Sequence, residues 1–194
     1  MNMYSIDKKG LLDVIRTWNS YLKRRVHLIA CGGTALTLLN VKESTKDIDF
    51  IVPETKEYSY LIGVLQDLGY KEATTFGWKR DDAFIFDLYL GKTVYMTELL
   101  ESPMEPGNNQ LFKEFSMIYV GILNYYDILI TKLFRSSTTD IEDCLNLVKT
   151  FKKDFDMRFF EKRFRQTASY DTSEEKDIKN LTYFSVRLKD EGLT

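Results

Sequence analysis

The 194-residue sequence contains few of the residues that several classes of protein depend on. Only three prolines occur, so long disordered linkers are not expected. The single histidine, His27, excludes a histidine-cluster metal site, and the two cysteines, Cys31 and Cys144, are too far apart for any zinc-ligand spacing. Two such cysteines are typical of reduced, buried thiols in a cytoplasmic protein.

Long hydrophobic runs and a strong charge imbalance are also missing. No apolar run approaches the ~20 residues of a membrane span, and the first ten residues lack the apolar part of a signal peptide. We therefore expect no membrane partner and a cytoplasmic location. The net charge of −2 argues against binding of nucleic acid over the whole surface, although 27 lysines and arginines allow a local basic patch.

Apolar periodicity divides the chain into a mixed first part and a helical second part. Strands are predicted at 26–31, 47–52 and 115–123, and residues 78–92 are predicted as a strand or as half of a hairpin. Helices are predicted at 5–24, 34–40, 55–70, 124–136, 138–151, 156–169 and 173–191. This order predicts an α+β fold, with a mixed β-sheet, flanking helices and a helical C-terminal part. We expect a catalytic core at 1–110, and the last core strand with a C-terminal helical subdomain at 111–194. The pattern leaves the oligomeric state open.

Two carboxylates interrupt the apolar strand "DIDFIV" at 47–52. Because side chains alternate across a strand, Asp47 and Asp49 are expected on one face, where they would repel each other. A divalent cation between them would remove this cost, and Mg²⁺ or Mn²⁺ prefers such oxygen ligands.

A third carboxylate, Asp87, interrupts the later apolar run "AFIFDLYL" in the same way. Three converging aspartates could hold two metal ions ~3.5–4 Å apart, which is the arrangement for in-line phosphoryl or nucleotidyl transfer. Asp87 would then be both a metal ligand and the general base for an attacking hydroxyl. Asp81 and Asp82 are alternatives for the third acid.

The pair Gly32 and Gly33 follows the first apolar strand and precedes a short helix. Backbone N–H groups at the start of a helix bind phosphate oxygens, and glycine lets a phosphate approach closely. The Thr34 hydroxyl adds a donor at the same place. Each of these signals is weak when taken alone, since a glycine pair is common in turns and alternating acids occur on exposed edge strands.

At these residues the sequence resembles the nucleotidyltransferase superfamily with the DNA polymerase β-like catalytic fold. The resemblance lies in "CGGTALTLL" from residue 31, "STKDIDF" from residue 44 and "FDLYL" from residue 86, and it is closest to AbiEii-type and related nucleotidyltransferases. It implies transfer of a nucleoside monophosphate from an NTP, with Mg²⁺ or Mn²⁺ held by Asp47, Asp49 and Asp87. It also implies that Gly33 and Thr34 bind the triphosphate.

A second signature of this family is similar to "DILITKLFRSSTTDIEDCLNL" from residue 127. It implies nucleotide-binding roles for Lys132, Arg135 and Asp143, with Asp140 close by. The alternative is that these residues lie on solvated faces of amphipathic helices. In the next helix, basic residues alternate with phenylalanines between 157 and 166; packing of the aromatic residues is favoured there over contact with RNA phosphates.

One residue departs from the family pattern. Glu43 stands where relatives often carry an arginine, and a carboxylate disfavours an anionic substrate; Lys42 or Lys46 could compensate, and we assign Lys46 to nucleotide binding. The acceptor could be tRNA, a protein or a small hydroxylated molecule, and the chain could be a toxin with an antitoxin protein as its partner. The alternatives are a catalytically silent nucleotide-binding or interaction module and, more weakly, a metal-dependent nuclease.

Overall fold

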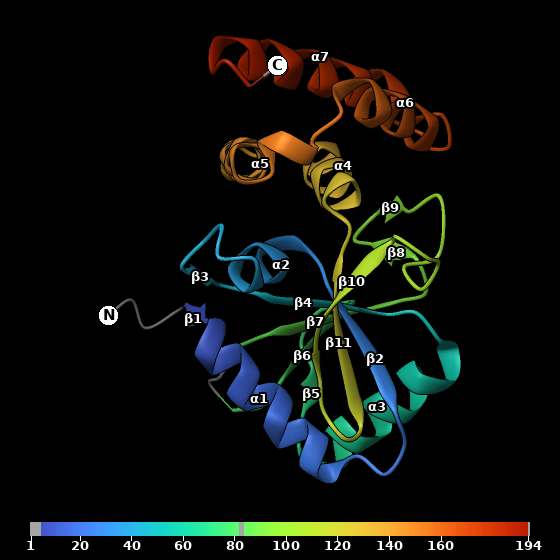
Figure 1. Cartoon of the computed structure of the whole chain (residues 1–194). Coiled ribbons are helices and arrows are strands. Elements are labelled where there is room, and N and C mark those ends of the chain that lie inside the picture. The colour runs from blue at the N-terminus through green and yellow to red at the C-terminus, as the bar shows by residue number, and fades with distance from the viewer. Residues whose placement is uncertain (1–4, 82–83, 194) are drawn as a thin grey trace. The chain divides into compact units, whose positions relative to one another are not determined.

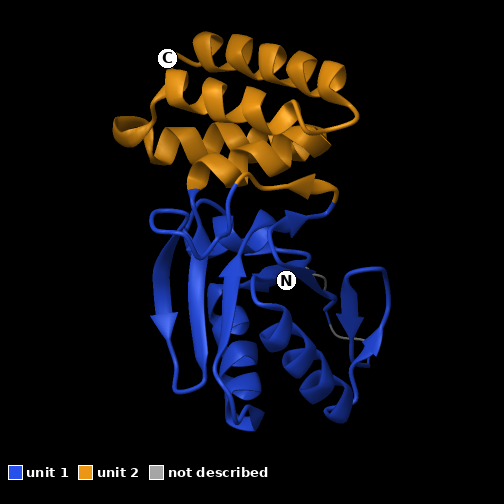
Figure 2. Ribbon diagram, turned by 90° about the vertical axis from the view of Figure 1, so that its right-hand side faces the viewer, with its two compact units in different colours: residues 1–95, 101–124 blue, residues 96–100, 125–194 orange. Residues whose placement is uncertain are grey.

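The computed structural model describes residues 5–81 and 84–193 (Figure 1), and within them the chain forms two compact units (Figure 2). The first unit comprises residues 1–95 and 101–124, and the second comprises residues 96–100 and 125–194. Asp82, one of the alternative third acids, lies outside the described residues. No helix in the described ranges is long and apolar enough to cross a membrane.

The first unit is built on a seven-stranded mixed sheet with the strand order β10-β11-β2-β4-β7-β6-β5. Two neighbouring pairs, β11 with β2 and β4 with β7, are parallel, and the other pairs are antiparallel. This mixed sheet confirms the predicted α+β class. The strands are β2 Val26–Ala30, β4 Ile48–Val52, β5 Lys71–Glu72, β6 Gly77–Lys79, β7 Phe86–Leu90, β10 Asn109–Glu114 and β11 Ile118–Leu123.

Three helices pack with this sheet: α1 Lys8–Tyr21, α2 Gly32–Leu38 and α3 Thr55–Asp67. Trp18 of α1 contacts the ring of Phe86 with centroids 4.7 Å apart, and its indole N–H donates to the Tyr70 hydroxyl. α3 packs against β2 and β4. The remaining short strands are β1 Ile6–Asp7, β3 Ser44–Thr45, β8 Thr93–Val94 and β9 Thr97–Glu98.

The pairing of β4 with β7 shows which of their side chains lie on each face of the sheet. Ile48 pairs with Phe86, and Phe86 contacts Trp18, so these even-numbered residues face α1. Asp49 pairs with Asp87 on the opposite face, since successive side chains alternate. The strand pleat therefore brings the two predicted acids together, away from α1.

The second unit contains four α-helices within its described residues: α4 Tyr125–Arg135, α5 Thr138–Thr150, α6 Met157–Ala168 and α7 Glu174–Asp190. A 3₁₀ turn, Lys152–Asp154, precedes α6. The rings of Phe160, Phe164 and Phe184 are fully buried and meet in edge contacts. Phe160 and Phe164 of α6 therefore lie in the core of this unit, as the packing prediction requires, whereas Phe159 is half-exposed.

The structure refines one strand prediction and adds a strand. Residues 78–92 contain the end of β6 and all of β7, which pair in antiparallel fashion, so the hairpin alternative describes them better than a single strand. β10 is a strand that the apolar pattern did not predict. β10 lies at the edge of the sheet and is largely exposed, so it lacks the apolar alternation that identifies a half-buried strand.

We predict that Asp127→Ala destabilises the helical unit by about 3–5 kcal/mol. The Asp127 carboxylate accepts two hydrogen bonds from Arg163, from Nε at 2.7 Å and from Nη2 at 2.9 Å, and both side chains are buried. Its removal leaves a buried guanidinium without this partner. Urea denaturation measures the change. Glu142→Ala is the matched control, because the Glu142–Arg187 pair is exposed and contributes at most about 1 kcal/mol.

A second prediction concerns Asp177 in the first turn of α7. Asp177 is 1% exposed, and its Oδ2 has no hydrogen-bond partner among the described residues. Burial and, secondarily, Asp171 raise its pKa from 3.8 to about 6, partly offset by Lys176. A carboxyl group with a raised folded-state pKa stabilises the fold below its unfolded pKa, and this contribution is lost as the pH rises through the folded pKa.

Wild-type protein should therefore lose stability relative to Asp177→Asn as the pH rises from about 4 to 7. Urea denaturation of both proteins at constant ionic strength measures the difference. Parallel pH profiles of the two proteins would contradict the prediction.

Candidate functional site

The candidate site lies where β4 and β7 run side by side. Asp49 and Asp87 are register partners on these parallel strands, and Asp47 immediately precedes β4. Asp49 is buried, Asp87 is half-buried and Asp47 is exposed. The three side chains therefore form a gradient from the interior of the first unit to its surface.

Asp87 is electrostatically coupled to its surroundings. Burial raises the pKa of its carboxyl group, and the nearby charge of Asp47 raises it further. Hydrogen bonds from the hydroxyls of Tyr95 and Tyr89 act in the opposite direction. A neighbouring negative charge favours the protonated form of a carboxyl group. Asp87 is therefore a stronger base than an exposed aspartate.

Tyr89 is a site residue that the sequence analysis did not single out. Its hydroxyl donates to Asp49 Oδ1 at 3.5 Å, and its ring lies 5.2 Å from those of Phe76 and Tyr95. Burial first, and Asp49 second, raise the pKa of this phenol, so it remains a hydrogen-bond donor. Its position two residues after Asp87 was the available signal, because such residues share a strand face.

The glycine pair is packed directly against the acidic strand. The backbone N–H of Cys31 donates to the Asp49 carbonyl at 3.2 Å. Gly32 has φ +53°, and a Cβ atom there would lie 2.5 Å from Asp49 Oδ2. A Cβ atom on Gly33 would overlap the Thr45 hydroxyl. Both glycines are therefore needed for α2 to begin beside Asp49.

Two threonine hydroxyls hold the backbone of the acidic motif. Thr34 Oγ1 accepts from the Asp49 N–H at 2.8 Å and donates to the Asp47 carbonyl at 3.4 Å. Thr45 Oγ1 donates to the same carbonyl at 2.9 Å. Thr34 is fully buried, so its hydroxyl positions the two acids; direct contact with a triphosphate stays a prediction.

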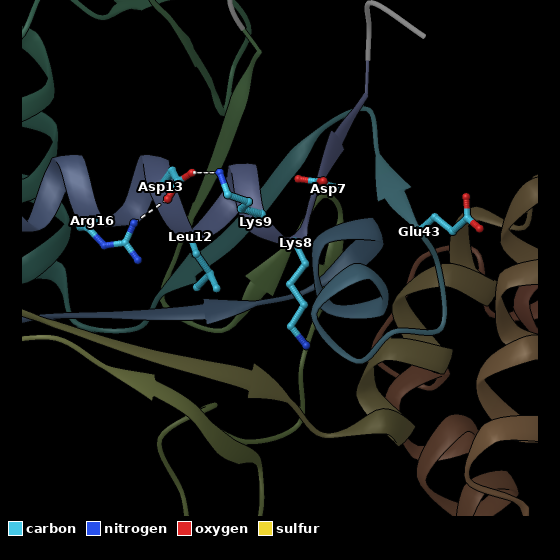
Figure 3. A pocket seen from close by; sticks show the side chains of 7 residues that line it. All are labelled: Asp7, Lys8, Lys9, Leu12, Asp13, Arg16 and Glu43. Carbon is cyan, nitrogen blue, oxygen red and sulfur yellow. Dashed lines mark hydrogen bonds and ion pairs between the residues drawn. The ribbon is translucent and has the colours of Figure 1, made fainter. Parts of the chain in front are cut away.

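Glu43 and Lys46, which precede the acidic strand, both lie on the surface. Lys46 is exposed and precedes Asp47 directly. Glu43 is also exposed and lines an open surface groove beside α1 (Figure 3). Asp13 in this groove pairs with Lys9 and Arg16. Glu43 therefore belongs to a mixed-charge surface.

In the second unit, the predicted residues form a buried ion network. Lys132 Nζ, on a side chain that is 3% exposed, lies 3.1 Å from Asp140 Oδ1 and 2.8 Å from Asp143 Oδ2. Arg135 donates to both Asp140 oxygens, at 2.8 and 2.6 Å. Asp140 also completes a capping box with Ser137 at the start of α5. This network joins α4 to α5, so the alternative of solvated helix faces is wrong for Lys132, Asp140 and Asp143, whereas Arg135 is exposed.

The charges of this network stabilise one another. Burial alone would lower the pKa of Lys132, but the Asp143 and Asp140 carboxylates raise it above its usual range. Burial alone would likewise raise the pKa of Asp140, but hydrogen bonds from Arg135 and Ser137 hold it well below that range. Lys132 and Asp140 are therefore both charged near neutral pH.

The donor set at the acidic strand is suited to a hard cation, because it consists of carboxylate oxygens. As they are placed, no three acidic, histidine or cysteine side chains in residues 5–81 and 84–193 could together hold a metal ion. The charge of Asp47 helps to raise the pKa of Asp87, and Asp49 accepts a hydrogen bond from Tyr89. The residue types fit Mg²⁺ or Mn²⁺, and binding would require Asp47, Asp49 and Asp87 to converge.

Comparison with known proteins gives a family and a fold. A family model described as nucleotidyltransferase of unknown function (DUF6036) matches residues 9–190. The solution structure of the antibiotic-resistance factor ANT(2'')-Ia is similar, with a TM-score of 0.52 and 15% sequence identity over 96% of this chain and 97% of that chain.

The crystal structure of ANT(2'')-Ia in complex with adenylyl-2''-tobramycin is also similar, with a TM-score of 0.51 and 16% identity over 91% of this chain and 96% of that chain. At these identities the likeness shows a shared fold. No curated protein matches the chain significantly.

We predict that Gly32→Ala destabilises the protein by about 1–2 kcal/mol or more, because a side chain is strained at positive φ and would also meet Asp49. Gly63→Ala is the matched control. Gly63 lies inside α3 with open space around it, so alanine should stabilise the protein by about 0.5–1 kcal/mol. Chemical denaturation compares the two variants, and equal effects would refute the proposed close packing.

Proposed function

The chain belongs to the DUF6036 family of nucleotidyltransferases, and from this we propose that it transfers a nucleoside monophosphate from an NTP to an acceptor hydroxyl. The observation that carries the proposal is the pairing of Asp49 with Asp87 on adjacent parallel strands, with the charge of Asp47 within reach of Asp87. Convergence of the three acids would have a large electrostatic cost, which a bound cation would relieve.

Asp47, Asp49 and Asp87 would hold one or two Mg²⁺ or Mn²⁺ ions. Such ions would stabilise negative charge on the reacting phosphate and on pyrophosphate. The backbone supports this assignment, since the Thr34 and Thr45 hydroxyls fix the Asp47 carbonyl while Tyr89 contacts Asp49.

Asp87 is the proposed general base. Its raised pKa, caused by burial and by Asp47, makes it a better proton acceptor than an exposed carboxylate. It would take the proton from the acceptor hydroxyl as the new bond from oxygen to the α-phosphorus forms. The bond between the α-phosphorus and the bridging oxygen then breaks, and pyrophosphate leaves.

The remaining predicted nucleotide contacts are Gly32, Gly33, Thr34, Lys46, Lys132, Arg135 and Asp143. Gly33 is partly exposed, and its lack of a side chain would let a phosphate approach the backbone N–H groups at the start of α2. An ammonium group has three donors, and Lys132 uses two of them on Asp140 and Asp143. We propose that Asp143 orients the Lys132 ammonium toward phosphate oxygens.

The acceptor is proposed as a class. ANT(2'')-Ia, which shares the fold, was crystallised with adenylyl-2''-tobramycin. A small molecule with hydroxyl groups is therefore one acceptor to test, alongside tRNA and protein. If the acceptor is tRNA, a role as a cytoplasmic toxin predicts growth arrest on expression, relieved by an antitoxin protein.

The test is incubation with each α-labelled NTP and Mg²⁺ or Mn²⁺, together with tobramycin, total tRNA or a protein extract. We expect label in one acceptor and a loss of at least about 10³-fold in rate for Asp87→Asn and for the double variant Asp47→Asn and Asp49→Asn. Asp13→Asn is the control, because Asp13 is an exposed carboxylate paired with Lys9 and Arg16.

The outcomes separate the competing functions. NTP binding without transfer to any acceptor would indicate a silent nucleotide-binding module. Absence of NTP binding in the presence of Mg²⁺ and Mn²⁺ would refute the proposed enzyme. Undiminished transfer by Asp87→Asn would refute the assignment of the general base.

A further inference from the structure

The outward face of α6 is basic. Arg158, Lys162 and Arg165 are all exposed and lie four and then three residues apart, which places them on one side of the helix. The opposite side carries the buried residues Phe160, Phe164, Thr167 and Ala168. We call the three cations the α6 basic face.

None of these three cations has an acidic partner within the described residues. Some cations on other helices do: Lys9 and Arg16 of α1 pair with Asp13, Lys149 of α5 pairs with Glu191, and Arg187 of α7 pairs with Glu142. Single exposed lysines such as Lys56 and Lys179 also have no acidic partner among the described residues, but on α6 three such cations share one side of the helix. The only acid in α6 is Glu161, at the border of its buried side. The α6 basic face is therefore a local positive patch on a chain whose net charge is −2.

Two exposed aromatic rings accompany the cations. Phe159 is 48% exposed although its ring also contacts Tyr126, and Tyr170, just beyond the end of α6, is 77% exposed. The core of this unit is formed by Phe160 and Phe164, and the exposed rings of Phe159 and Tyr170 lie outside it. Their apolar surface is therefore open to a binding partner. Cations interspersed with exposed rings suit a polymer that has phosphates and flat bases.

We propose that the α6 basic face, with Phe159 and Tyr170, binds single-stranded nucleic acid. The three cations contact successive phosphates, and the two rings stack with unpaired bases. An acidic protein segment would satisfy the cations but would offer no bases to the rings. The surface is formed within the second unit alone, so the proposal does not depend on nucleotidyl transfer.

The test is fluorescence anisotropy with labelled oligo(U) RNA and oligo(dT) DNA, without NTP, using full-length Asp47→Asn protein so that transfer cannot occur. For three phosphate contacts, the logarithm of the binding constant should fall with the logarithm of salt concentration with a slope of about −2. The RNA and DNA probes distinguish the two kinds of strand.

Changing Arg158, Lys162 and Arg165 together to Gln should weaken binding at least tenfold at low salt and nearly remove the salt dependence. The control changes Lys56, Lys71 and Lys179 to Gln, three exposed lysines elsewhere, and gives a protein of the same net charge. This control should bind like the parent. Equal weakening by both triple variants would overturn the proposal.

Changing Phe159 and Tyr170 together to Leu should weaken binding about tenfold while leaving the salt slope unchanged, since stacking releases no counterions. Circular dichroism confirms folding of each variant. Labelled poly-glutamate is the competing probe. If poly-glutamate binds as tightly as oligo(U), the site recognises anionic polymers in general and the nucleic-acid proposal fails. It also fails if the variant with Leu at positions 159 and 170 binds oligo(U) and oligo(dT) as tightly as the parent.

Discussion

The contact between the start of α2 and the acidic strand determines the arrangement of the whole site. Gly32 approaches Asp49 so closely that any side chain would collide with the carboxylate, and the Cys31 N–H bonds to the Asp49 carbonyl. Thr34 then reaches across to the backbone on both sides of Ile48. The glycine pair thus places a helix start, with its unpaired N–H groups, beside a buried acid.

Around this contact the structure holds like charges close together. The charge of Asp47 helps to raise the pKa of Asp87, and the hydroxyls of Tyr89 and Tyr95 offset part of this effect. Such a group is expensive for stability alone, because apolar residues on this sheet face would pack without repulsion. A bound cation would offset the repulsion between the acids. The loss of stability would then be the consequence of a site built for the proposed transfer.

In the helical unit, buried charges are paired with opposite charges. Lys132, Asp140 and Asp143 are buried and neutralise one another, as do Asp127 and Arg163. The α6 basic face is the contrasting case, because its cations point away from the core and have no acidic partner among the described residues. Internal ion pairs therefore connect the helices, while α6 carries three cations without acidic partners, among the described residues, on one exposed side.

The sequence by itself determined the mixed sheet, the helical C-terminal part and the acids at 47, 49 and 87, because alternation and helical periodicity are local properties of the chain. It could not reveal Tyr95 or Thr45 as site residues, since their partners are set by the folded chain; for Tyr89 the only signal was its strand alternation with Asp87. It also could not distinguish buried from solvated charges in α4 and α5. Only the tertiary structure decided that Lys132 pairs with two acids, because burial depends on which helices pack together.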